Sequence, residues 1–123
     1  MLLSFPHQFL CALPPSSRPE WASRMSELLD IEGFLVCLEF PSAKDPKAGG
    51  PPYALPAAVY KAHLTHPGDK VPYKDDGYVE EDAELASNPM ALQSVDRWQP
   101  ARTHEIGKGQ DWMSVWQHVE GHV

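Results

Sequence analysis

Arg18 is the charged residue whose place in the chain is hardest to explain by folding alone. It falls where a helix is expected to begin, and the partial positive charge of a helix N-terminus disfavours a cation there. A cation placed against this local preference favours a role in binding a ligand. The competing interpretation is that Arg18 is solvated or paired with Glu20.

The run Gly49-Gly50-Pro51-Pro52-Tyr53 is a second candidate site. Glycine adopts backbone angles that other residues resist, and the two prolines stiffen the chain that follows. A flexible joint beside a rigid one suits a loop that closes over a substrate, with Tyr53 presenting an aromatic face and a hydroxyl. The same dipeptides also mark ordinary surface turns, so a connector without function is the alternative.

The histidines do not form a metal-binding pattern. His63 and His66 straddle an expected helix end before Pro67, while His118 and His122 fall in a strand and a tail. No cluster of cysteines or carboxylates completes either pair, so no metal is expected. A Ser-His-Asp triad has no nucleophile-elbow motif to support it.

Composition fits one ordinary globular domain of 123 residues in the cytoplasm, with 42% hydrophobic and 22% charged residues. The formal net charge of -7 argues against nucleic acid or an acidic membrane surface as a partner. Cys11 and Cys37 lie in apolar runs, as expected for buried, reduced thiols. No window approaches the ~18 apolar residues of a membrane span, and the start of the chain lacks the positive charge of a signal peptide.

The elements that would position these residues alternate between strand and helix. The segment from Phe9 to Leu13 fits the end of a buried strand. A capping box from Ser17 to Glu20 predicts a helix over 18–29. The run from Gly33 to Phe40 has no polar alternation, as in a parallel strand with helices on both faces. Strand, helix and strand in this order indicate an α/β fold with a right-handed crossover.

The second half of the chain is expected to hold one more helix and two more strands. The helix starts at Pro56 and ends before Pro67. Residues 69–89 read as a solvated acidic loop excursion, with seven acids and two lysines between residues 69 and 84. Two strands, Trp98 to Ile106 and Trp112 to Val119, would form a closing antiparallel hairpin.

Four blocks of this sequence together resemble the thiopurine S-methyltransferase family, including its plant and fungal thiol and halide methyltransferases. The blocks are His7-Gln8-Phe9-Leu10-Cys11-Ala12-Leu13-Pro14-Pro15, Arg18-Pro19-Glu20-Trp21-Ala22, the run from Gly33 to Pro41, and Gly49-Gly50-Pro51-Pro52-Tyr53. In that family they are the fourth strand, the helix after it, the fifth strand and an acceptor-side loop. The resemblance covers about residues 7–118. It implies a partial Rossmann-like class I methyltransferase fold, with strand-helix-strand-helix followed by a C-terminal antiparallel hairpin.

The resemblance also implies roles for particular residues. Those that would flank the methyl group of S-adenosyl-L-methionine are Phe9, Cys11 and Ala12, for which plain core packing is the alternative. Those that would lie beside the methyl acceptor are Arg18, Gly49, Gly50, Pro51, Pro52 and Tyr53. The family's reaction is displacement of a methyl group from a sulfonium by a thiolate or halide, and binding the two reactants in line does most of the work.

The glycine-rich cofactor turn of such domains has no counterpart in this sequence. We therefore expect residues 1–123 to form a single truncated domain that lacks the N-terminal cofactor-binding half. The leading hypothesis is S-methylation of a small thiol by the full-length relatives, with this chain inactive alone. The alternatives are a non-functional fragment and a non-catalytic module that self-associates through the bare edge of the strand at 9–13. Thiol, thiopurine, thiocyanate and halide acceptors all remain open.

Overall fold

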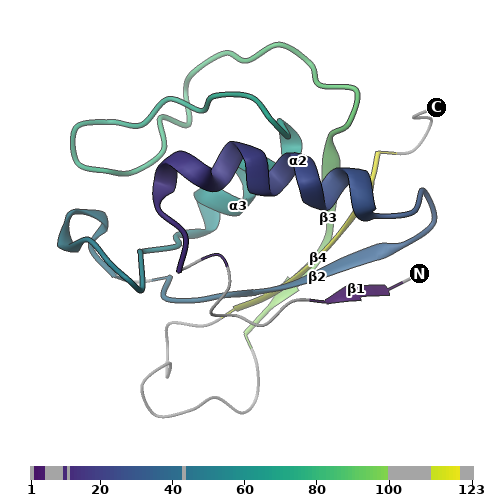
Figure 1. Cartoon of the computed structure of the whole chain (residues 1–123), viewed down its shortest axis with the longest axis horizontal. Helices are drawn as coiled ribbons and strands as arrows, with labels where there is room; N and C mark the ends of the chain where they lie inside the picture. Colours follow the sequence, from purple (N-terminus) through teal and green to yellow (C-terminus); the bar gives the residue numbers. More distant parts are fainter. Residues whose placement is uncertain (1, 5–9, 11, 43, 100–111, 120–123) are drawn as a thin grey trace.

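A four-stranded sheet carries two α-helices on one of its faces (Figure 1). The computed structural model describes residues 2–4, 10, 12–42, 44–99 and 112–119. Its elements are β1 (Leu2–Ser4), η1 (Pro15–Ser17), α2 (Arg18–Leu28), β2 (Phe34–Glu39), η2 (Pro46–Ala48), α3 (Ala57–Thr65), β3 (Leu92–Trp98) and β4 (Trp112–His118). None of the helices it describes is long and apolar enough to cross a membrane.

The strand order is β1-β2-β4-β3, so β4 lies between two strands that precede it in the chain. β1 runs parallel to β2, while β4 runs antiparallel to both β2 and β3. The expected α/β class is confirmed, as is an antiparallel pair of strands closing the sheet. The first strand of that pair is Leu92–Trp98, however, and not Trp98 to Ile106 as expected. All of its residues after Gln93 are exposed, so backbone pairing with β4 defines this strand rather than an apolar pattern.

The strand expected between Phe9 and Leu13 is wrong. Leu10 is helical, and the Leu13 backbone N–H donates to the Leu10 carbonyl at 3.0 Å, so the chain turns here. Leu10 is buried and Leu13 packs against the core. In so short a segment, two apolar side chains three residues apart on a turn cannot be distinguished from the end of a strand by pattern alone. The strand that pairs with β2 lies earlier, at Leu2–Ser4, and forms the edge of the sheet.

Both α-helices were predicted from their apolar spacing, and both are confirmed. The capping box is wrong: Ser17 has a helical backbone (φ -91°, ψ -6°) and its side chain makes no capping hydrogen bond, because η1 runs directly into α2. Trp21 of α2 meets Tyr60 of α3 edge to face, with ring centroids 6.0 Å apart. This contact joins the two helices above the sheet.

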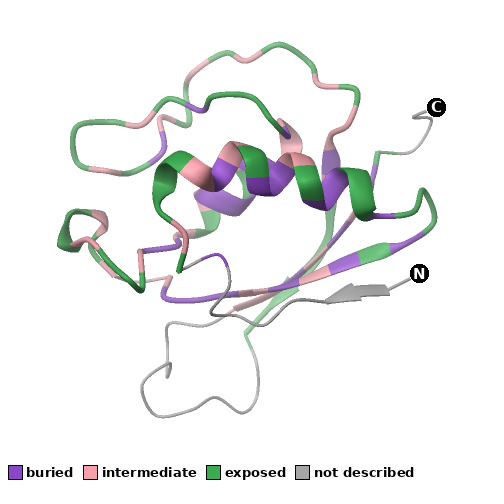
Figure 2. Cartoon of the chain, viewed as in Figure 1, coloured by how far each residue is buried: buried purple, intermediate pink, exposed green. Residues whose placement is uncertain are grey.

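Burial alternates along β2, because the described helices cover only one face of the sheet (Figure 2). Leu35, Cys37 and Glu39 are buried on the helix side. On the opposite side Phe34 is 41% exposed, and Val36 and Leu38 are half-buried. The near-continuous apolar run therefore does not reflect helices on both faces within the described part of the chain.

The acidic segment 69–89 passes over α3 without forming a helix or a named strand (Figures 1 and 2). Its acidic side chains are mostly exposed, as expected for a solvated excursion. Val71 and Val79 are nevertheless part of the buried core, and Tyr73 forms an isolated β-bridge with Val79. Apolar contacts therefore fix this segment against α3.

Candidate functional site

A cavity of about 340 Å³ lies where α2 begins, between the 42–56 loop and the acidic segment. Arg18, Tyr53 and Tyr73 are among the side chains that line it. The loop returns to the sheet because the Leu55 backbone N–H donates to the Pro41 carbonyl at 2.9 Å. This closure places the Ala54 carbonyl against the first turn of α2.

Arg18 is the charged group of this cavity, and it is only 3% exposed. One terminal nitrogen donates to the Ala54 carbonyl at 2.9 Å, and the other donates to the Tyr73 hydroxyl at 3.0 Å. The guanidinium carbon also lies 5.8 Å from the centre of the Tyr73 ring. Within the described part of the chain Arg18 has no ion-pair partner, and Glu20 is exposed. The interpretation of Arg18 as solvated or paired with Glu20 is therefore wrong.

His63 of α3 completes this polar network from the opposite side. Its ring is 1% exposed, and its Nε2 atom lies 2.7 Å from the Tyr73 hydroxyl. Burial first, and the Arg18 charge second, lower the pKa of His63 from 6.5 to about 4. The imidazole is therefore neutral near pH 7 and adds no charge that would compete with Arg18.

From the run 49–53, Tyr53 lines the cavity and Gly50 packs closely against Tyr53. Tyr53 is half-buried and lines the cavity. A Cβ atom on Gly50 would lie 2.7 Å from both the ring and the backbone nitrogen of Tyr53, so only glycine fits there. Gly49, Pro51 and Pro52 do not line the cavity. The lysine Nζ of Lys44 donates to the Pro52 carbonyl and braces the loop.

The residues that the resemblance assigns to the cofactor are not brought to this cavity by the described structure. Ala12 is exposed on a turn and does not line it. Phe9 and Cys11 lie outside the described residues.

Sequence reasoning missed the acidic segment's part in the site. Tyr73 lines the cavity, and so does Gly77, which has a positive φ of 88°. A Cβ atom on Gly77 would lie 2.7 Å from the Cβ atom of Pro46, so the segment packs directly on the 42–56 loop. Val71, Tyr73 and Val79 among so many acids were the available signal, because apolar side chains are unusual in a solvated loop.

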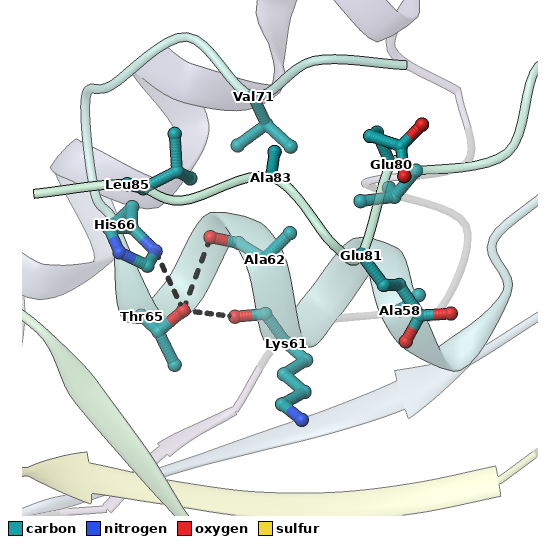
Figure 3. Close-up of a pocket in the computed structure, with 11 residues that line it drawn as sticks. Ala58, Lys61, Ala62, Thr65, His66, Val71, Glu80, Glu81, Ala83 and Leu85 are labelled. Carbon is teal, nitrogen blue, oxygen red and sulfur yellow. Dashed lines mark hydrogen bonds between the residues drawn. The ribbon is translucent and has the colours of Figure 1, made fainter. Parts of the chain in front are cut away.

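Two further cavities border α3. The smaller, about 130 Å³, separates α3 from the acidic segment, and Figure 3 shows Val71, Ala83 and Leu85 above Ala62. Its Thr65 hydroxyl is already bonded to neighbouring groups of α3 and its C-terminal end.

The larger cavity, about 520 Å³, lies between α3 and β3. Its buried carboxylate, Glu39, pairs with Arg97 at 3.1 Å, and the Arg97 guanidinium lies 4.2 Å from the centre of the Trp112 ring. The buried charge of this cavity therefore already has a partner of opposite charge. Among the described residues the buried Arg18 cation has only neutral partners, which makes the first cavity the better candidate site. Nowhere in the described ranges do three His, Cys, Asp or Glu side chains gather as a metal site would require.

Comparison with known proteins agrees with the family expectation. The sequence model of the thiopurine S-methyltransferase family matches residues 3–99, against the 7–118 expected. A probable thiol methyltransferase 2 of Arabidopsis thaliana is 35% identical over 102 residues, which are 82% of this chain and 42% of that protein. Thiocyanate methyltransferase 1 of the same plant is 32% identical over 96 residues, 78% of this chain and 39% of that protein.

Thiocyanate methyltransferase 1 of Brassica oleracea is 38% identical over 68 residues, which are 55% of this chain and 29% of that protein. The chain thus spans about two fifths of the length of the two Arabidopsis relatives, at 42% and 39%. The matched residues 3–99 include α2, β2, the 42–56 loop and the whole acidic segment. This chain belongs to the thiopurine S-methyltransferase family.

Proposed function

We propose that this chain is the acceptor side of a cytoplasmic S-adenosyl-L-methionine-dependent methyltransferase that methylates the sulfur of a small thiol. The observation that carries the proposal is the buried Arg18 guanidinium, whose partners in the cavity are all neutral. Family membership and relatives named as thiol and thiocyanate methyltransferases support it. The strand order β1-β2-β4-β3 with its helices on one face is compatible with a partial Rossmann-like class I methyltransferase fold.

Arg18 would act by stabilising the anionic form of the acceptor. A buried guanidinium is stabilised by an anionic partner, and a thiolate, a halide or thiocyanate would each supply the negative charge. Tyr53 would form an apolar wall that excludes water and strengthens this attraction. Bound S-adenosyl-L-methionine supplies an electrophilic sulfonium methyl group. Ala12 is exposed, and contacts of Phe9, Cys11 and Ala12 with the cofactor stay a prediction from the resemblance.

Turnover is proposed for the complete domain, since the chain spans 42% of the thiol methyltransferase relative and contains no glycine-rich cofactor turn. Alone, the chain is expected to be inactive. The first test is a calorimetric titration of the purified, folded chain with S-adenosylhomocysteine. Micromolar binding would mean that a cofactor site exists without the glycine-rich turn, and the chain would then be assayed for methyl transfer to thiols. Methyl transfer by the chain alone would contradict the expected inactivity.

Arg18→Gln is the variant that tests the acceptor side. Losing a hydrogen-bonded charge should weaken binding of a thiocyanate probe about tenfold or more, and Arg18→Lys should rescue part of it because the charge remains. Glu20→Gln is the matched control, because Glu20 is exposed and outside the cavity. Equal thiocyanate affinity in Arg18→Gln and the wild type would refute the proposed acceptor site.

A second candidate function is a non-catalytic module that pairs through its sheet. It is favoured by β1 at the sheet edge and by the 41% exposure of Phe34 on the face opposite the helices. Sedimentation of the chain would then reveal concentration-dependent association that Phe34→Glu weakens. A compact monomer at all concentrations would exclude this candidate.

A further inference from the structure

We propose that Tyr73 and His63 are positioning residues that fix the Arg18 guanidinium for an anionic acceptor. The inference deepens the proposed function and rests on it. The two residues lie 55 and 45 positions along the chain from Arg18. In the fold, Tyr73 is hydrogen-bonded to Arg18, and His63 to Tyr73.

The order of donors and acceptors sets the direction of this network. A guanidinium only donates, so the Tyr73 hydroxyl accepts the hydrogen bond from Arg18, at 3.0 Å. The hydroxyl has one proton of its own, and its other neighbour is Nε2 of His63 at 2.7 Å. We assign that proton to the hydrogen bond with His63, which makes Nε2 the acceptor.

His63 is suited to accept because it is neutral. It is buried on α3, and burial together with the Arg18 charge keeps its pKa far below 7. With Nε2 accepting, the ring proton sits on Nδ1, which has no hydrogen-bond partner among the described residues. The histidine thus fixes the orientation of the Tyr73 hydroxyl, and the hydroxyl in turn fixes Arg18.

Tyr73 is itself fixed by the acidic segment. Backbone hydrogen bonds from Lys74 to Tyr78 (2.8 Å) and from Glu80 to Pro72 (2.9 Å) close a turn around it. Buried Val79 pairs with Tyr73 across that turn. The network therefore joins the start of α2, the end of α3 and the acidic segment at one point.

The choice of a phenol as partner also preserves the charge of Arg18. A carboxylate in the place of Tyr73 would hold the guanidinium equally well but would neutralise it. The neutral Tyr73–His63 pair orients the cation and leaves its charge for the ligand. Arg18 Nε, which is buried and has no partner in the described structure, is consistent with a guanidinium not yet fully satisfied.

The test is NMR detection of arginine Nε–H groups in the whole chain at pH 6, with proton exchange rates as readout. Arg18→Lys identifies the Arg18 signal, and Arg97, whose Nε donates to Glu39 at 3.1 Å, is the internal control. Tyr73→Phe removes a hydrogen bond from the Arg18 guanidinium, and His63→Phe removes the group that orients the Tyr73 hydroxyl. Both variants should loosen the guanidinium and speed exchange at Arg18 Nε by about tenfold or more. They should weaken binding of a thiocyanate probe by a similar factor.

His63→Gln separates positioning from packing. Its amide oxygen can accept the Tyr73 proton where Nε2 did, so exchange at Arg18 and thiocyanate binding should match the wild type. The inference is overturned if His63→Gln behaves like His63→Phe, or if Tyr73→Phe leaves exchange unchanged. The expected exchange pattern without any thiocyanate binding in the wild type would support the positioning network and overturn the proposed acceptor site.

Discussion

Acidification should destabilise this chain through His63. The pKa of His63 is lowered from 6.5 to about 4 in the folded state, so between these values the unfolded chain binds a proton that the folded chain does not. The stabilisation that His63 contributes is therefore complete above about pH 6.5 and is lost as the pH falls toward 4. At pH 5 the unfolded histidine is almost fully protonated and the folded one is almost neutral. Linkage then gives a loss of about 2 kcal/mol in the free energy of unfolding between pH 7 and pH 5.

Urea unfolding followed by tryptophan fluorescence measures this loss. Trp21 packs on Tyr60, one turn before His63 on α3, so its fluorescence reports the region concerned. Other groups of the chain also respond to pH, so the comparison is with His63→Gln, which cannot take up the proton. The variant should lose about 2 kcal/mol less than the wild type over the same interval. Equal losses in the two proteins would refute the assignment of a buried, neutral His63.

Three further substitutions or treatments test other parts of the structure. Gly50→Ala places a Cβ atom 2.7 Å from a tyrosine ring and should lower the free energy of unfolding in urea by about 1–3 kcal/mol, and an unchanged midpoint would contradict the tight loop. Arg97→Met leaves Glu39, which is 1% exposed, without its ion-pair partner. Because Arg97 is 34% exposed, the free energy of unfolding, measured by thermal unfolding, should fall by only about 2 kcal/mol. No fall would mean that the pair is not formed. Burial, with a smaller effect of the Glu39 carboxylate, raises the pKa of the Cys37 thiol. With the other cysteine replaced by serine, a disulfide reagent should therefore react with the folded chain about a hundredfold more slowly than with the urea-unfolded chain. Equal rates would exclude a buried thiol.

The helices and β2 could be predicted because their own side chains form the core. Trp21 and Met25 of α2 recur at helical spacing and are buried together, and β2 is apolar except for Glu39. β3 could not be predicted in this way. Its residues from Ser94 onward are exposed. Its pairing with β4 depends on backbone hydrogen bonds, which leave no pattern in the side chains.

The candidate site divides along the same line. Arg18 stood out because a cation at a helix start conflicts with a local rule, and Tyr53 because Gly50 and two prolines precede it. Tyr73 gave no such conflict, since a tyrosine between proline and lysine in an acidic stretch is unremarkable as sequence. Its role depends on a fold that brings it within 2.7 Å of His63. Local rules can therefore identify residues that conflict with them. They cannot identify residues whose role depends on contacts made only in the tertiary structure.

The place of β4 has a consequence for how the chain acquires its structure during synthesis. Among the described strands β4 is made last, yet it supplies the hydrogen-bonding partner of β3 and the second partner of β2. Until residues 112–118 leave the ribosome, β3 has no strand beside it and β2 pairs only with the short β1. Residues 40–111 separate β2 from β4 along the chain, and bringing the two strands together costs conformational entropy. Completion of the sheet should therefore be the slow step of folding. In a nascent chain, one edge of β2 should therefore stay without a partner strand until β4 inserts.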